Sequence, residues 1–161
     1  MSTALLRSNI LAVFFLSILS MSAISAPAPD WTLQDAQGND VSLVDYKGKV
    51  LILHFWATWC PYCKRVQPGL DKLYKEYKEQ GLELISISFA EDEGANPQKS
   101  IDDRGHHFKT LLNGDEVAKQ YQVSGTPTTF FIDKKGELAA VTHTSNPEEP
   151  GMRKIVEKLL K

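Results

Sequence analysis

The chain has only two cysteines, Cys60 and Cys63, and few other residues that could join them as metal ligands. There is no second C-x-x-C pair and no pair of histidines with zinc-site spacing. His106 and His107 are adjacent, whereas His54 and the remaining histidine stand alone. A structural zinc site needs four ligands in such groups, so metal binding is disfavoured and no metal site is expected.

The sequence also lacks an excess of charge of either sign, with 18 Lys+Arg against 20 Asp+Glu. It has no basic stripe with interleaved aromatic residues, so nucleic acid is not expected as a partner. We find no internal repeat and no low-complexity segment. A length of 161 residues with 42% hydrophobic residues fits one packed domain. We expect a monomer.

A membrane-spanning helix needs about 20 apolar residues, and the one long apolar run is shorter. The run "ILAVFFLSIL" follows Arg7 and leads into small residues before Pro27. This pattern predicts a secretory signal peptide over residues 1–25, cleaved after Ser25. The alternative is an uncleaved membrane anchor through residues 10–24. Both interpretations predict an exported, periplasmic protein, where paired cysteines normally form disulfides.

Residues 26–161 read as one domain in which buried strands alternate with helices. The runs "VLILHFW" (residues 50–56) and "LELISISF" (residues 82–89) are continuous and apolar, as expected of strands buried on both faces. The amphipathic segment between them predicts a helix over residues 61–80, kinked at Pro68. Strand, helix and strand in this order predict a parallel pair with a right-handed crossover.

The remaining segments complete an α/β pattern. The segment before residue 50 predicts a small hairpin or extended lead-in around the turn "QGND". "NPQKSIDDRG" and "GDEVAKQYQV" predict helices, "TTFFID" and "ELAAVTH" an antiparallel hairpin, and "PEEPGMRKIVEKLL" an amphipathic helix. We therefore expect a central mixed β-sheet flanked by helices, with an N-terminal extension.

The stretch "HFWATWCPYCK" places both cysteines at the start of the predicted helix. As a structural staple, a disulfide closing a four-residue loop contributes only about 2 kcal/mol in the chain-entropy model. As a redox pair, Cys60 gains from the unpaired N–H groups and the dipole at the helix start, which stabilise a thiolate. Cys63, one turn along, is placed to attack a mixed disulfide formed at Cys60.

The run "FWATWCPYCKRVQP" resembles the active-site segment of thioredoxin-fold proteins, in particular exported TlpA/ResA-type disulfide reductases. The similarity extends through "WTLQDAQGNDVSLVDYKGKVLIL" before it and "YQVSGTPTTFFIDKKGEL" after it. The resemblance implies a thioredoxin-like fold and a cofactor-free thiol-disulfide oxidoreductase. It also implies that Cys60 is the nucleophile and Cys63 the resolving thiol of a redox disulfide. Thr126-Pro127 would be a cis-proline peptide that faces the thiols and offers its backbone to an extended client segment.

The resemblance further implies client proteins with thiols or disulfides, such as apocytochrome c, and electrons from a membrane-embedded donor. Reduction is the favoured direction. The dipeptide between the cysteines, however, gives the "CPYC" of glutaredoxins, so a disulfide oxidant or isomerase remains an alternative. An alternative of another class is a copper or zinc chaperone that uses the C-x-x-C as ligands.

Three further residues are candidates for the site, each with two interpretations. Trp59 precedes the first thiol and either contacts substrate or fills surface. His54 replaces the buried Asp of thioredoxins and is either a core histidine or a proton acceptor for Cys63. Glu91 follows the second strand near the carboxyl edge of the sheet and either tunes the thiols or belongs to a solvated acidic loop.

Overall fold

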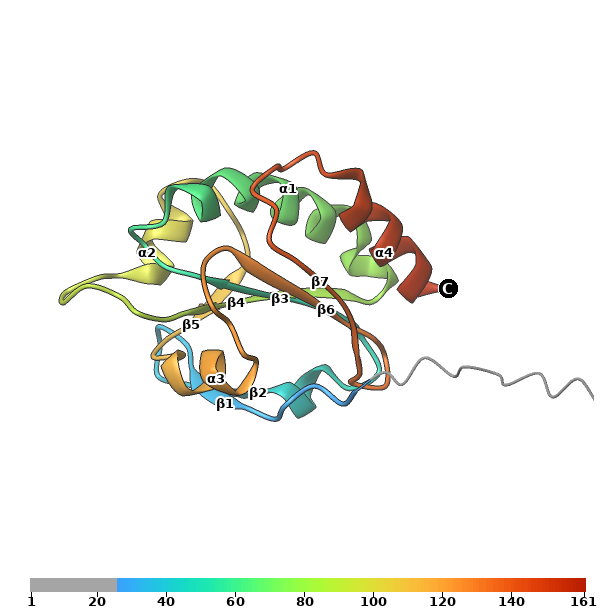
Figure 1. Cartoon of the computed structure of the whole chain (residues 1–161), viewed down its shortest axis with the longest axis horizontal. Coiled ribbons are helices and arrows are strands. Elements are labelled where there is room, and N and C mark those ends of the chain that lie inside the picture. The colour runs from blue at the N-terminus through green and yellow to red at the C-terminus, as the bar shows by residue number, and fades with distance from the viewer. Residues whose placement is uncertain (1–25) are drawn as a thin grey trace, which may run out of the picture.

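The computed structural model describes residues 26–161, and the predicted signal peptide, residues 1–25, lies outside the described residues. A five-stranded sheet with the order β5-β4-β3-β6-β7 forms the centre of the domain (Figure 1). The parallel pair predicted from the sequence is confirmed as β3 (Val50–Trp56) and β4 (Leu82–Ser88).

The other half of the sheet is antiparallel, which makes the sheet mixed as predicted. β6 (Thr128–Ile132) lies antiparallel to β3 on the side away from β4. β7 (Leu138–Thr142) continues antiparallel to β6 and forms one edge, and β5 (Lys109–Leu111) lies parallel to β4 at the other. The central strand β3 is therefore paired on both sides.

Helices and a hairpin cover both faces of the sheet. Figure 1 shows α1 (Pro61–Tyr77), α2 (Pro97–Asp102) and α4 (Pro150–Leu160) on one face. On the other face lie α3 (Asp115–Gln120), the hairpin of β1 (Thr32–Gln34) and β2 (Asp40–Ser42), and the 3-10 helix Leu43–Tyr46. No helix within residues 26–161 has the length and apolar character to span a bilayer.

The residues of β3 alternate between two cores, which explains its unbroken apolar run. Ile52 and Trp56 pack with the side chains of α1, α2 and α4, whereas Leu53 and Phe55 pack with those of α3 and the hairpin. All seven residues of β3 are buried. A strand covered on both faces needs apolar residues at successive positions rather than at every second one.

Several elements are shorter than predicted, and one was not predicted. The three-residue strand β5 is too short for its alternation to stand out from the polar residues around it. α2 and α3 have six residues each; the chain takes up positive φ at Gly105 after α2 and at Gln122 after α3. α1 contains Pro68, as predicted, but gives way at residue 78 to a 3-10 turn that Gly81 closes.

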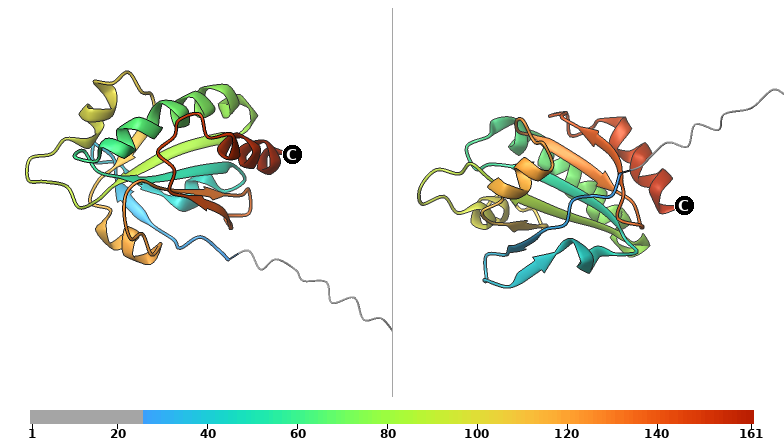
Figure 2. Two further views of the ribbon diagram at one scale, coloured as in Figure 1. Left: turned by 45° about the horizontal axis from the view of Figure 1, so that its top comes forward. Right: turned by 60° about the horizontal axis from the view of Figure 1, so that its bottom comes forward.

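The described chain begins at the end of the sheet where β3 also begins. The Ala28 N–H donates to the Gly136 carbonyl at 2.9 Å, and the Leu138 N–H donates to the Ala26 carbonyl at 2.8 Å. β3 then runs through the sheet to its opposite end (Figure 2). Its last residue, Trp56, leads into the cysteine motif. At about 3.3 Å per residue, β3 alone separates the two ends by roughly 20 Å.

A buried carboxylate fastens the lead-in hairpin to β5. Asp35 accepts hydrogen bonds from the backbone N–H groups of Gln37 and Asn39 at 2.9 and 3.0 Å. Lys109 of β5 reaches the same carboxylate at 2.8 Å. The Lys109 ammonium is the main reason that the pKa of Asp35 is held well below its usual range.

The low pKa of Asp35 predicts that its contribution to the stability of the fold depends on pH. A carboxyl group whose folded pKa is depressed stabilises the fold above its unfolded pKa of about 4 and loses that contribution as the pH falls toward the folded value. Asp35→Asn should therefore lower the urea midpoint near neutral pH, and its gap from wild type should narrow below about pH 4. Asp40→Asn, an exposed position in the same hairpin, is the control with little expected effect. A gap that is constant with pH would contradict the assignment.

Candidate active site

The two cysteines are joined in a disulfide at the N-terminus of α1, as predicted. Cys60 is the N-cap residue with an extended backbone, and its Sγ accepts the Cys63 N–H at 3.1 Å. Pro61 occupies the first turn, where its lack of an N–H costs no helical hydrogen bond. The Cys60 sulfur therefore takes the place that a capping oxygen usually has, against the positive end of the helix.

Exposed aromatic rings flank a disulfide that is itself almost buried. Cys60 is 2% exposed and Cys63 is 0% exposed, whereas Trp59 and Tyr62 are 51% and 53% exposed. The Arg65 guanidinium lies 5.4 Å from the centre of the Tyr62 ring. The exposed surface next to the disulfide is therefore aromatic.

Glu91 holds the loop that precedes the disulfide. Both of its carboxylate oxygens lie 3.0 Å from the Thr58 backbone N–H, and the Thr58 hydroxyl donates to Oε2 at 2.6 Å. The Trp59 indole N–H donates to the Ala90 carbonyl at 2.7 Å. Glu91 is thus not a solvated loop residue but a tie between the loop after β4 and the residues before Cys60.

The peptide between Thr126 and Pro127 is cis, as the resemblance implied. Thr128, the next residue, pairs with Phe55 near the carboxyl end of β3. This loop therefore lies at the same end of the sheet as the cysteines. The Thr128 hydroxyl donates to the Gly125 carbonyl at 2.7 Å and lies 3.0 Å from His143 Nδ1. Since that hydroxyl has only one hydrogen, His143 is the donor of the second contact.

His54 lies in the centre of the sheet and is fully buried. Its Nδ1 lies 2.9 Å from the Thr129 hydroxyl, and its Nε2 has no hydrogen-bond partner. Burial lowers the pKa of His54 to about 3, so the imidazole is neutral at physiological pH. The size of this shift makes the ring a weaker base than an ordinary histidine.

Comparisons with known proteins agree with this site. A model of the AhpC/TSA family matches residues 24–141. Thiol-disulfide oxidoreductase ResA of Geobacillus kaustophilus is 37% identical over 129 residues, which cover 79% of this chain and 74% of that protein. ResA of Geobacillus thermodenitrificans is 36% identical over 148 residues, or 91% and 84% of the two chains. This chain belongs to the AhpC/TSA family as a ResA-type thiol-disulfide oxidoreductase.

The structural comparison agrees with the sequence comparison. A thiol:disulfide interchange protein from Bacteroides sp. superposes with a TM-score of 0.70 at 27% sequence identity. The superposition covers 83% of this chain and 90% of the other. The predicted thioredoxin-like fold is therefore confirmed, and so is the predicted disulfide oxidoreductase activity.

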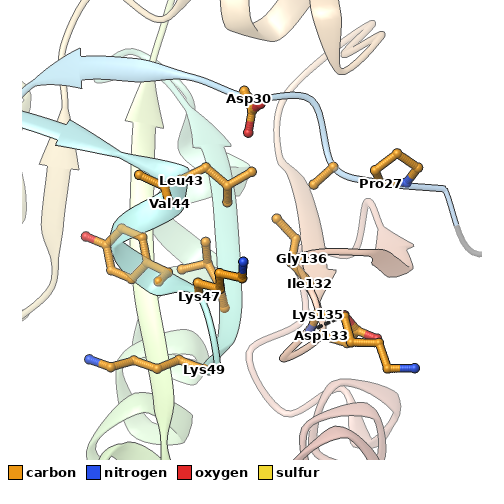
Figure 3. A pocket seen from close by; sticks show the side chains of 13 residues that line it. Pro27, Asp30, Leu43, Val44, Lys47, Lys49, Ile132, Asp133, Lys135 and Gly136 are labelled. Atoms are coloured by element: carbon orange, nitrogen blue, oxygen red, sulfur yellow. Dashed lines mark hydrogen bonds between the residues drawn. The ribbon is translucent and has the colours of Figure 1, made fainter.

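A pocket of about 280 Å³ in this oxidoreductase is not part of the redox site. Pro27, Lys47, Ile132 and Gly136 are among its lining residues (Figure 3). These residues come from the end of the domain where the described chain begins, opposite the disulfide. Within residues 26–161, no group of three or more His, Cys, Asp or Glu residues is placed to hold a metal ion.

Sequence reasoning missed the groups that support the predicted site residues. Thr58 lies inside the motif that carried the resemblance, yet nothing in the sequence links it to Glu91, 33 residues later. In the sequence, His143 is an isolated histidine with nothing to mark a partner. Its contact with Thr128 depends on the antiparallel register of β6 and β7, which a prediction of two strands does not fix.

The position of His54 leads to a kinetic prediction. If Nδ1–H donates to Thr129 and Nε2 comes within reach of the reduced Cys63, the Nε2 lone pair can take the Cys63 proton as that thiol attacks a mixed disulfide. His54→Ala should then slow release of a mixed disulfide by about tenfold to a hundredfold and change its pH profile, but leave the attack by Cys60 near wild type. Both steps can be followed by stopped-flow mixing.

A structural histidine would give another result in the same experiment. Stability would fall while both steps and their pH profiles stayed unchanged, and Glu91 would become the better candidate for tuning the thiols. Thr129→Val is the matched control, because it removes the hydroxyl contact but keeps the imidazole.

Proposed function

We propose that this protein is an exported reductase that uses its Cys60-Cys63 pair to reduce disulfides in client proteins. The main support is the disulfide at the helix N-terminus, next to exposed aromatic rings and the cis-proline loop. Export is supported by the N-terminal sequence, which fits either a cleaved signal peptide or an anchor. The domain acts as a monomer.

The reaction passes two electrons from the dithiol to the client. The Cys60 thiolate attacks one sulfur of the client disulfide, forms a mixed disulfide and releases the other client sulfur as a thiolate. Cys63 loses its proton and attacks the Cys60 sulfur, which restores the Cys60-Cys63 disulfide and releases the second client thiolate. A membrane-embedded dithiol donor then reduces the pair for the next cycle.

Cys60 is suited to the first attack because of its place on α1. As N-cap residue it lies against unpaired backbone N–H groups, and its sulfur already accepts one of them from Cys63. Such donors stabilise a thiolate and lower the pKa of the thiol. Cys63 lies one turn along α1, is fully buried, and is bonded through its sulfur to Cys60.

Client binding would use the surface beside the disulfide. Thr126 is half-buried and precedes the cis peptide, so its backbone is a candidate for pairing with an extended client segment. Trp59 is tied to Ala90 by its indole N–H, which leaves the exposed ring in a fixed place for contact. Apocytochrome c with its cysteines oxidised is the client class that the family resemblance favours.

The direction of exchange can be tested by measuring the reduction potential. Related C-x-x-C proteins span about −270 to −120 mV, and the reductases lie at the negative end. Equilibration with glutathione or dithiothreitol should give a value more negative than about −220 mV for a reductase. A value near −150 mV would instead support the disulfide oxidant or isomerase, which the "CPYC" motif leaves as the second candidate.

The roles of the two cysteines can be tested by trapping. Cys63→Ser keeps the nucleophile but removes the resolving thiol, so it should accumulate mixed disulfides with clients, visible on non-reducing gels. Cys60→Ser should trap almost nothing, because Cys63 lies one turn inside α1 and lacks the N-cap position that stabilises a thiolate. Equal trapping by both variants would refute the assignment of roles.

A further inference from the structure

A half-buried arginine packs against the core cluster that contains the redox pair. Arg104 follows α2, and its guanidinium lies over the Trp56 ring, 5.6 Å from the ring centre. Trp56 is 0% exposed and belongs to the same apolar cluster as Cys60 and Cys63. One large side chain therefore contacts the cation and shares a core with both cysteines.

Gln67 holds this cation from the helix that carries the cysteines. Its Oε1 accepts a hydrogen bond from Arg104 Nη2, and Arg104 Nη1 donates to the Ser100 hydroxyl at 2.7 Å. Gln67 is fully buried and lies four residues after Cys63, on the same face of α1 and about 6 Å along the helix. The side chain that holds the cation thus starts about one helical turn after the resolving cysteine.

The polar cluster formed by Gln67, Ser100 and Arg104 has hydrogen-bond donors without an acceptor. Gln67 Nε2 and Arg104 Nε are both buried and have no acceptor. Buried N–H groups nearly always find a partner, and leaving one unpaired costs free energy. In the disulfide form, the region next to the cysteines therefore has more donors than acceptors.

The charge of Arg104 also lacks a counter-ion. Its contacts are an amide oxygen, a hydroxyl and an indole ring, all neutral, and no carboxylate within residues 26–161 lies within salt-bridge distance of it. The neighbouring Asp103 is exposed and paired with Lys99 at 2.7 Å. Burial lowers the pKa of Arg104 but leaves it charged, because guanidinium groups stay protonated in proteins.

The other titratable groups near the pair are neutral or already engaged. His54 on β3 is neutral, and Glu91 accepts the Thr58 hydrogen bonds. On the far side of Gln67, Asp71 is paired with Lys75 at 2.6 Å and lies 3.7 Å from His106 Nδ1. None of these groups neutralises Arg104.

We propose that Arg104, held in place by Gln67, is a positioning residue whose charge stabilises the thiolate formed when the Cys60-Cys63 disulfide is reduced. Two electrons and one proton convert the disulfide to one thiolate and one thiol near neutral pH. The thiolate supplies the negative charge that this half-buried cation lacks. The cation thereby lowers the pKa of the reactive thiol and favours the reduced form, which makes the reduction potential less negative.

The test compares charge variants in the full-length protein. Arg104→Gln should raise the pKa of the reactive thiol by about one unit, followed by the ultraviolet absorbance of the thiolate across a pH titration. It should also shift the equilibrium constant with glutathione about tenfold toward the disulfide, which is about 30 mV for this couple. Arg104→Lys keeps the charge and should stay within about threefold of wild type.

Gln67→Glu is the second variant, because it places a carboxylate against Arg104 without removing the arginine. It should shift the thiol pKa and the potential in the same direction as Arg104→Gln, and it keeps the test decisive if Arg104→Gln does not fold. The matched control is Arg65→Gln, which removes an exposed cation near the cysteines. Water screens that charge, so its effect should be less than about threefold.

Two outcomes would overturn the proposal. In one, Arg104→Gln and Gln67→Glu lower stability toward urea while the thiol pKa and the potential stay at wild-type values, which would make the cluster structural. In the other, Arg65→Gln changes both quantities as much as Arg104→Gln does. Neither measurement uses a client protein, so the result does not depend on the direction of exchange in the proposed function.

Discussion

The site depends on the junction between the central strand and the helix that follows it. β3 is buried on both faces and paired on both sides, so the position of Trp56 at its carboxyl end is fixed by the core. Four residues later, Cys60 caps α1, and the helix places its unpaired N–H groups and its dipole at the sulfur. The reactivity of the cysteine pair thus depends on the N-terminus of α1, and the core fixes the position of that helix end.

Loops from other strands complete the site around this junction. Glu91 ties the loop after β4 to Thr58, and Ala90 adopts positive φ while its carbonyl accepts the Trp59 indole N–H. On the other side, the Thr128 hydroxyl closes the turn that contains the cis peptide. Rigid strands with functional loops at their ends are the usual arrangement in α/β proteins, where sites collect at the carboxyl edge of parallel strands.

The sequence was sufficient for the elements with long, continuous patterns. The apolar runs of β3 and β4 and the stripe of α1 were recognised because burial on both faces, or on one helical face, leaves a repeated signal. β5 was missed because a strand of three residues is too short to show a periodic pattern. The helices predicted on either side of it were too long, because nothing in the sequence shows that a residue such as Gln122 adopts a positive φ and ends the helix. The contact between Gln67 and Arg104 joins positions 37 residues apart, so only the packed structure could reveal it.

The disulfide lies in the apolar core rather than on a loose surface loop, and this links two quantities that are usually measured apart. Reduction and unfolding form a closed thermodynamic cycle. The difference in unfolding free energy between the oxidised and reduced proteins must therefore equal the difference between the reduction potentials of the folded and unfolded chains multiplied by 2F, the charge of the two electrons. Every tenfold preference of the fold for the dithiol makes the reduced protein about 1.4 kcal/mol more stable relative to the disulfide form. For this protein, a measured reduction potential therefore also reports how much more stable the fold is with the cysteines reduced than with them oxidised.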